Sequence, residues 1–212
     1  MLKGMILYDG GGVRILVACE ESQVVCKAFR ERGHEAYSCD IIECSGGHPE
    51  WHIRDDVLSH LEDGWDMMIA HPPCTYLTVT ANRSFVNNPD RWKKRLDAML
   101  FVHTLLNAPI RKICLENPVG VISTHIRKPE QIIQPWMFGH EAQKTTCLWL
   151  KNLPALEPTD IVGKGEFVVF KSSGKKMPKW YADFPSTNRP DNAKLRSKTF
   201  RGIAEAMSLQ WA

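Results

Sequence analysis

The sequence predicts a single α/β domain with a mostly parallel sheet and helices on both of its faces. Short apolar runs of strand length alternate along the chain with segments whose apolar residues recur at helical spacing. Such alternation is typical of parallel sheets, because each crossover between parallel strands usually contains a helix. The 212 residues are 43% hydrophobic and 24% charged, which suffices for a full core without a disulfide framework. No apolar run reaches the roughly 18 residues that a membrane-spanning helix requires.

The first strand and helix are predicted near the N-terminus. Residues 14–18 (RILVA) are an apolar run between glycines and a polar Cys-Glu-Glu-Ser segment, which indicates a buried strand. Residues 22–32 place four apolar side chains on one helical face, with charged residues opposite. Gly33 is expected to end this helix.

Two further strands and a long helix follow. Residues 35–39 (EAYSC) and 66–70 (DMMIA) are predicted strands, and residues 90–106 carry an apolar stripe typical of an amphipathic helix. We expect the stripe to lie in the core; it consists of Trp92, Leu96, Met99, Leu100, Val102 and Leu106. The solvated face of the same helix is expected to carry Arg91, Lys93, Lys94 and Arg95.

The remaining elements complete the alternation. Residues 111–115 (RKICL) are a predicted strand, as are residues 145–150 and 166–170. Residues 201–211 predict a terminal helix.

The chain divides into a core over residues 1–150, a small basic insertion over 151–195 and a C-terminal helix over 196–212. The insertion is rich in Pro, Gly, Ser and Lys. Residues 160–201 hold ten Lys/Arg against four Asp/Glu, a net charge of +6, whereas residues 1–159 hold 17 against 19, or −2. This asymmetry favours a polyanionic partner; a solvated, lysine-rich loop is the alternative.

The seven cysteines are expected to be thiols. The N-terminal residues show no signal-peptide pattern, so we expect a cytoplasmic protein in which disulfides are rare. Cys26, Cys114 and Cys147 fall within predicted helices or strands and are interpreted as core residues. A cysteine outside these elements could carry chemistry.

Polar residues follow four predicted strands, where each strand ends. They are Cys19-Glu20-Glu21, Asp40, His71-Pro72-Pro73-Cys74 and Glu116-Asn117. The carboxyl ends of parallel strands share one edge of the sheet, and open α/β sheets bind their ligands at that edge. The sequence therefore predicts a site there that contains thiols and carboxylates.

Cys74 and Glu116 are the candidate reactive pair. Pro72 and Pro73 stiffen the loop after the strand and lack N–H donors, so the next side chain projects from a rigid support. A thiol beside a carboxyl suits nucleophilic attack on a polarised ring or carbonyl. The alternative is a proline turn with a buried cysteine and a loop-capping glutamate.

These segments resemble the DNA cytosine-C5 methyltransferase family, and more closely its short phage-type members. The resemblance rests on IAHPPCTYLTVTANR (69–83), ICLENPVG (113–120), Asp40, the Arg54-Asp55-Asp56-Val57 segment, Gln143-Lys144 and the C-terminal RSKTFRGIAEAMSLQWA (196–212). It implies an S-adenosylmethionine-dependent methyltransferase (Rossmann-like) fold, with S-adenosyl-L-methionine as cofactor and DNA as partner. It further implies a monomer in the cytoplasm of a bacterial or phage-infected cell, without a membrane partner.

The resemblance also implies roles for individual residues. Cys74 is the implied nucleophile, and Glu116 with Asn117 holds the target base. The implied cofactor-binding residues are Cys19, Glu20, Ser22, Asp40, Ile41, Asp56, Val57, Pro72 and Gly202. The implied substrate-binding residues are Gln143, Lys144, Lys175, Lys176 and Lys179.

Other interpretations remain open. The small insertion permits an RNA or free nucleotide substrate, and the glycine-free turn after the first strand (ACEESQ) permits a DNA-binding protein without transfer activity. An amino-methyltransferase is disfavoured, because HPPC lacks both ends of that family's Asp/Asn/Ser-Pro-Pro-aromatic pattern. The spacing Cys39-x4-Cys44-x3-His48-x3-His52 could bind zinc but is not a standard finger, and no metal is expected.

Overall fold

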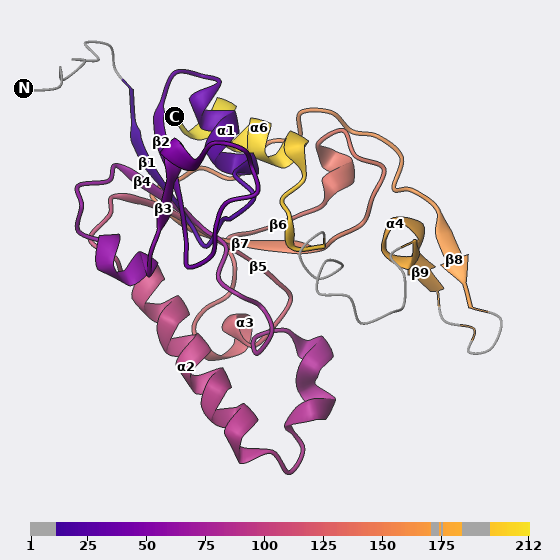
Figure 1. Ribbon diagram of the computed structural model, residues 1–212. Helices are drawn as coiled ribbons and strands as arrows, with labels where there is room; N and C mark the ends of the chain where they lie inside the picture. The colour runs from indigo at the N-terminus through magenta and orange to yellow at the C-terminus, as the bar shows by residue number, and fades with distance from the viewer. Residues whose placement is uncertain (1–11, 171–173, 175, 184–195) are drawn as a thin grey trace, which may run out of the picture.

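The computed structural model describes residues 12–170, 174, 176–183 and 196–212. A seven-stranded sheet forms its centre (Figure 1). The strands are β1 (Arg14–Ala18), β2 (Glu35–Asp40), β3 (His52–Arg54), β4 (Met67–Ala70), β5 (Lys112–Pro118), β6 (Gln131–Ile133) and β7 (Thr146–Lys151). The α-helices around it are α1 (Val24–Arg30), α2 (Pro89–Leu106), α3 (Ile122–His125) and α6 (Arg201–Trp211). Short 3-10 helices are η1 (Pro49–Trp51), η2 (Val57–His60), η3 (Val79–Phe85) and η4 (Pro135–Met137).

The strand order is β3-β2-β1-β4-β5-β7-β6, and only β7 runs antiparallel to its neighbours. This confirms the predicted fold class, an α/β fold with a mostly parallel sheet and helices on both faces. β1 pairs with β2 on one side and with β4 on the other, so the order of the strands reverses at β1. Such a reversal opens a crevice at the carboxyl ends of the strands.

The two faces of β1 build two separate cores. Ile15 and Val17 pack with residues of α1 and α6, whereas Leu16 packs with residues of α2 and α3 on the opposite face. This division follows from the alternation of side chains along a strand. Figure 1 shows α1 and α6 side by side on one face and α2 on the other. Gly33, at φ 84°, ends the turn after α1 as expected.

Several short elements were not predicted. β3 and β6 have three residues each and carry no periodicity that a pattern could detect. β5 also extends further than predicted, through Pro118, so Glu116 and Asn117 lie within the strand. The extension is stabilised by antiparallel pairing, in which Pro118 lies opposite Thr146 of β7.

The predicted core stripe of α2 is wrong at three of its six positions. Trp92, Leu96 and Leu100 are between 50% and 66% exposed, because this part of the helix extends beyond the sheet and has η3 as its neighbour (Figure 1). Arg95, which was expected to face solvent, is buried instead. Its guanidinium lies 3.6 Å from the ring centroid of Phe85 and donates to the Tyr76 carbonyl at 2.7 Å. The cation therefore ties η3 and the preceding loop to the helix.

A second, two-stranded sheet lies within the predicted insertion. It pairs β8 (Phe167–Val169) with β9 (Lys176–Pro178) and is followed by α4 (Lys179–Ala182). β8 confirms the strand predicted over 166–170, whereas β9 and α4 were not predicted. Across the described residues, no helix has the length and apolar character needed to span a membrane.

Candidate functional site

A cavity of about 470 Å³ lies at the carboxyl edge of the sheet, beside the reversal in strand order. Six of the residues predicted to bind a cofactor line it: Cys19, Asp40, Ile41, Asp56, Val57 and Pro72. The sequence interpretation missed much of the remaining lining: Cys39, Asp55, Pro73, Tyr76, Lys94, Asp97, Ala98 and Phe101. Phe101 lies on α2 but was not part of the predicted apolar stripe, and no sequence signal indicates that it reaches this edge.

Carboxylates and apolar walls share the cavity. Burial raises the pKa of Asp40, although its Oδ1 accepts a hydrogen bond from the Ile42 amide at 3.2 Å. Asp56 caps η2, because its Oδ1 accepts from the Leu58 amide at 3.0 Å. Burial raises the pKa of the Cys19 thiol, and the charge of Asp40 adds a smaller rise, so this thiol is protonated. The cavity thus suits a ligand with hydroxyl groups, an apolar ring and a positive charge.

Glu20, Ser22 and Gly202 do not line the cavity. Glu20 is 5% exposed and accepts hydrogen bonds from the Val25 and Cys26 amides at 2.7 and 3.1 Å, so it caps the start of α1. Ser22 is buried in the turn before that helix. At Gly202 an added Cβ would stand 1.9 Å from the Phe138 carbonyl oxygen, so glycine permits α6 to approach Phe138.

Cys74 is exposed on a loop that two neighbouring strands hold in place. The His71 amide donates to the Ala18 carbonyl of β1 at 2.9 Å, and the Asn117 side-chain amide of β5 donates to the Pro72 carbonyl at 2.7 Å. The Cys74 carbonyl accepts from the amides of Leu77 and Thr78 at 3.0 Å each. These bonds explain why the proline loop presents its thiol in one place, as the sequence predicts. They also give Asn117 a positioning contact with this loop.

Glu116 lies beside this loop, in β5, and contacts His71. The His71 Nδ1 is 3.1 Å from Glu116 Oε2, and the two side chains are only 12% and 14% exposed. Burial alone would raise the pKa of Glu116, but the hydrogen bond and charge of His71, with the charge of Lys144, outweigh it and lower that pKa. The carboxyl group is therefore ionised at neutral pH.

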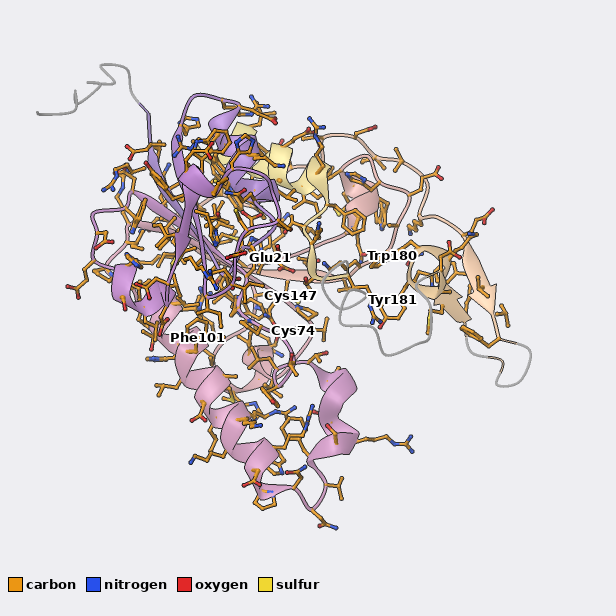
Figure 2. The ribbon with its side chains drawn as sticks, in the orientation of Figure 1. Glu21, Cys74, Phe101, Cys147, Trp180 and Tyr181 are labelled. Atoms are coloured by element: carbon orange, nitrogen blue, oxygen red, sulfur yellow. The ribbon has the colours of Figure 1, made fainter. Side chains whose placement is uncertain are left out.

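The thiol of Cys74 is coupled electrostatically to the same groups. Desolvation of the sulfur and then the negative charge of Glu116 raise its pKa, while the positive charge of Lys144 opposes the rise. Cys74, Glu116 and Lys144 come from three separate segments of the sequence, and the fold brings them within electrostatic range of one another. Figure 2 shows Cys74 near the middle of the molecule, with Trp180 and Tyr181 on the neighbouring small unit.

The predicted substrate-binding residues divide into two groups. Lys144 donates to the Lys198 carbonyl at 3.2 Å, and the Gln143 carbonyl accepts from the Trp180 indole at 2.9 Å, so this pair joins the core to the later segments. Lys176 lies 4.4 Å from the ring centroid of Phe167, and Lys179 forms an ion pair with Asp183. The remaining predicted residue, Lys175, lies outside the described residues.

The histidines of the alternative zinc spacing have other partners. His52 contacts the Ser38 hydroxyl through Nδ1 at 2.8 Å and the Ile42 carbonyl through Nε2 at 2.9 Å. His48 stacks on Trp51 with ring centroids 3.8 Å apart, and Cys39 is buried. The described ranges contain no group of three or more His, Cys, Asp or Glu that could hold a metal ion.

The raised pKa of Cys74 predicts how alkylation of the free protein depends on pH. Because the thiolate is the nucleophile, the rate of iodoacetamide modification at Cys74 should rise about tenfold per unit between pH 7 and pH 9. The substitution Glu116→Gln removes the charge that raises the pKa and should accelerate the reaction at any pH in this range. Peptide mapping separates Cys74 from Cys44, which is also partly accessible. A rate at Cys74 that is constant over this range contradicts the prediction.

Comparison with protein-family models gives no match, and comparison with curated proteins also gives none. Among solved structures, the chain is similar to a candidate DNA modification methyltransferase encoded within a prophage of Escherichia coli. The two share 12% sequence identity, with a TM-score of 0.45 over 72% of this chain. The match spans about half of that protein's length, 52%. The strand order of the sheet thus remains the basis for the fold, and the function is argued from the site.

Proposed function

We propose that this protein transfers a methyl group from S-adenosyl-L-methionine to C5 of cytosine in DNA through a covalent adduct with Cys74. One observation carries the proposal: an exposed thiol on a fixed proline loop lies in the electrostatic field of a buried carboxylate, directly beside the cavity. Pro72 and Pro73 line the cavity and Cys74 follows them in the chain, so ligand and nucleophile would meet at this edge.

Cytosine C5 is a poor nucleophile until the ring is activated. Attack of the Cys74 thiolate on C6 forms a sulfur–carbon bond and turns the ring into an enamine whose C5 is nucleophilic. Glu116 faces the N3 and N4 edge of the base and offsets the charge that develops during this addition. With S-adenosylmethionine bound, C5 would take its methyl group, and a base or water would then remove the C5 proton. Elimination of Cys74 as thiolate then restores the ring.

The residues at the cavity fit the cofactor. Asp40 and Asp56 offer carboxylates to the ribose and adenine, while Ile41, Val57 and Phe101 provide apolar walls. When bound, S-adenosylmethionine supplies an electrophilic methyl group on a sulfonium centre. The acidic side chains also complement that positive charge.

DNA is the favoured substrate because of Lys144 near Cys74 and because of the excess of basic residues in the C-terminal part of the sequence. Lys144 acts electrostatically on the thiol, and residues 160–201 carry the net charge of +6. Tyr181 is 39% exposed, and the guanidinium of Arg196 lies 5.0 Å from its ring centroid. Such basic and aromatic surfaces bind phosphates and unstacked bases, and a base must leave the duplex to reach an enzyme nucleophile.

Product analysis tests the proposal. The full chain is incubated with duplex DNA and cofactor labelled in its methyl group, and the nucleosides are separated after digestion. We expect label in 5-methylcytosine, and less label as the salt concentration rises. Label in N4-methylcytosine or N6-methyladenine contradicts the proposal. Parallel incubations with RNA and with cytidine nucleotides provide the comparison. Label in RNA or nucleotide but not in DNA would show that the substrate belongs to the alternative class.

A protein that binds DNA but has lost transfer activity is the second candidate, because the turn after β1 has no glycine and Glu20 there caps a helix. Calorimetry with the cofactor distinguishes the two candidates. Cofactor binding with a dissociation constant in the micromolar range supports the enzyme, whereas DNA binding without cofactor binding supports the second candidate.

A further inference from the structure

We propose that a small hollow between the start of α2 and the loop after Cys74 binds a phosphodiester group of the DNA backbone, held by Arg91 and Lys94. The hollow has a volume of about 230 Å³ and is lined by Tyr76, Asn88, Asp90, Arg91 and Lys94. The inference rests on the proposed function, because it assigns one contact to the DNA substrate. It gives a role to two cations that the sequence predicted only as part of a solvated helix face.

Arg91 is a cation that the fold holds in place. Its guanidinium carbon lies 5.1 Å from the ring centroid of Tyr76 and 5.1 Å from that of Phe85, so two aromatic rings fix its position. Its Nε is buried and has no hydrogen-bond partner among the described residues. The Asn88 side chain accepts from the Arg91 backbone amide at 3.0 Å, so it caps the helix and leaves the guanidinium unbonded. The fold therefore leaves the hydrogen-bonding capacity of this cation incomplete.

Lys94 adds a second cation about one turn further along the helix. Its Nζ lies 5.9 Å from the ring centroid of Tyr76, so both cations converge on the same ring. Arg95 adds positive charge behind them: burial and then the charge of Arg91 lower the pKa of Arg95. Among the described residues, no ion pair involves Arg91 or Lys94. An anion in the hollow would offset the repulsion within this group of cations.

Asp90 sets the sign of the electrostatic test. It is the one carboxylate among the described residues that line the hollow, and it is exposed in the first turn of α2. Two cations against one carboxylate leave a positive balance, so the hollow fits an anion. Removal of the Asp90 charge should therefore strengthen binding, whereas removal of either positive charge should weaken it.

The hollow lies next to the proposed reaction site. Tyr76 and Lys94 also line the larger cavity at the sheet edge. The Cys74 carbonyl accepts from the Leu77 amide, so Tyr76 belongs to the turn that begins at the nucleophile. Buried Arg95 donates to the Tyr76 carbonyl at 2.7 Å and fixes this turn against α2. The ligand expected here is thus a backbone phosphate close to the target cytosine, whose two charged oxygens suit a guanidinium and an ammonium group.

The test measures the affinity of the full chain for fluorescent duplex DNA by anisotropy, without cofactor and over a range of salt concentrations. Arg91→Gln and Lys94→Gln should each lower the affinity by about five- to tenfold in low salt and reduce the slope of its salt dependence by about one. Asp90→Asn should raise the affinity by about two- to fivefold.

Lys93→Gln is the matched control. Lys93 is exposed beside Lys94 and loses the same charge, but it does not line the hollow, so the affinity should stay within about twofold of wild type. Because Lys94 is exposed, Lys94→Gln decides the test even if Arg91→Gln, which removes a side chain packed against two rings, disturbs the loop.

The outcomes separate this inference from the proposed function. Equal losses in Lys93→Gln and Lys94→Gln, or a loss in Asp90→Asn, would overturn the inference. Titration with deoxycytidine monophosphate distinguishes the source of the phosphate: if Lys94→Gln loses affinity for the free nucleotide but not for DNA, the backbone assignment is wrong. Absence of DNA binding by wild-type protein would overturn the proposed function together with the inference. The expected variant pattern without any methylation would overturn only the transfer reaction.

Discussion

The substitution Cys74→Ser is expected to lower the rate of cytosine methylation in DNA by at least about 1000-fold, since loss of a nucleophile removes the covalent route. A serine hydroxyl is far less ionised than a thiol and would add to C6 very slowly. The fold should survive, because Cys74 is exposed and only its backbone carbonyl holds the following turn. Bisulfite sequencing of host DNA after expression of each protein measures the effect.

Cys44→Ser is the matched control for this experiment. Cys44 is a free thiol of intermediate exposure that does not line the cavity, so methylation should match that of wild type. The covalent complex with 5-fluorocytosine DNA should also vanish in Cys74→Ser and persist in Cys44→Ser. Methylation by Cys74→Ser at more than about a tenth of the wild-type rate would exclude Cys74 as the nucleophile.

The substitution Glu20→Ala is expected to lower the free energy of unfolding by about 3 kcal/mol, because it leaves two buried backbone amides without an acceptor. These amides, of Val25 and Cys26, are in the first turn of α1, whose N-cap residue Gln23 makes no side-chain cap of its own. Helix α1 packs on α6, so the loss should affect the whole domain. Denaturant unfolding followed by circular dichroism measures it.

Glu31→Ala provides the control, since this exposed carboxylate lies at the other end of α1 and should change stability by less than about 0.5 kcal/mol. Cofactor affinity per folded molecule should be unchanged in Glu20→Ala, because Glu20 does not line the cavity. Unchanged stability with lost cofactor binding would instead support the sequence-based interpretation of Glu20 as a cofactor ligand.

The long strands and helices could be predicted because each carries a periodic pattern. β1, β2, β4 and α6 lie within a residue or so of their predicted bounds. Three-residue strands such as β3 and β6 form through pairing with neighbours and have no pattern of their own. The stripe on α2 was placed wrongly because the spacing of apolar residues shows only that a helix has an apolar face. It does not show how far the sheet extends beneath that face.

Part of the site was also accessible to sequence reasoning. Cys74, Glu116 and Asp40 follow or end predicted strands, and the shared edge of a parallel sheet brings such positions together. Glu20 satisfied the same rule and yet caps a helix, because a strand-end side chain can turn towards the next helix as well as towards the cavity. Phe101 and Tyr76 reach the cavity only through the packing of α2 and of the loop after Cys74.

The sequence by itself determined the class of the fold, the edge of the sheet that carries the cavity and the stiff loop that presents Cys74, because local periodicity and proline geometry act over a few residues. The tertiary structure decided which polar groups meet. His71, Glu116 and Lys144 are separated by at least 28 positions in the chain. Only the pairing of β1, β4, β5 and β7 brings them together, so that Glu116 contacts His71 and both Glu116 and Lys144 act on the Cys74 thiol. Burial and charge, which set the pKa of Cys74 and Glu116, exist only after that assembly.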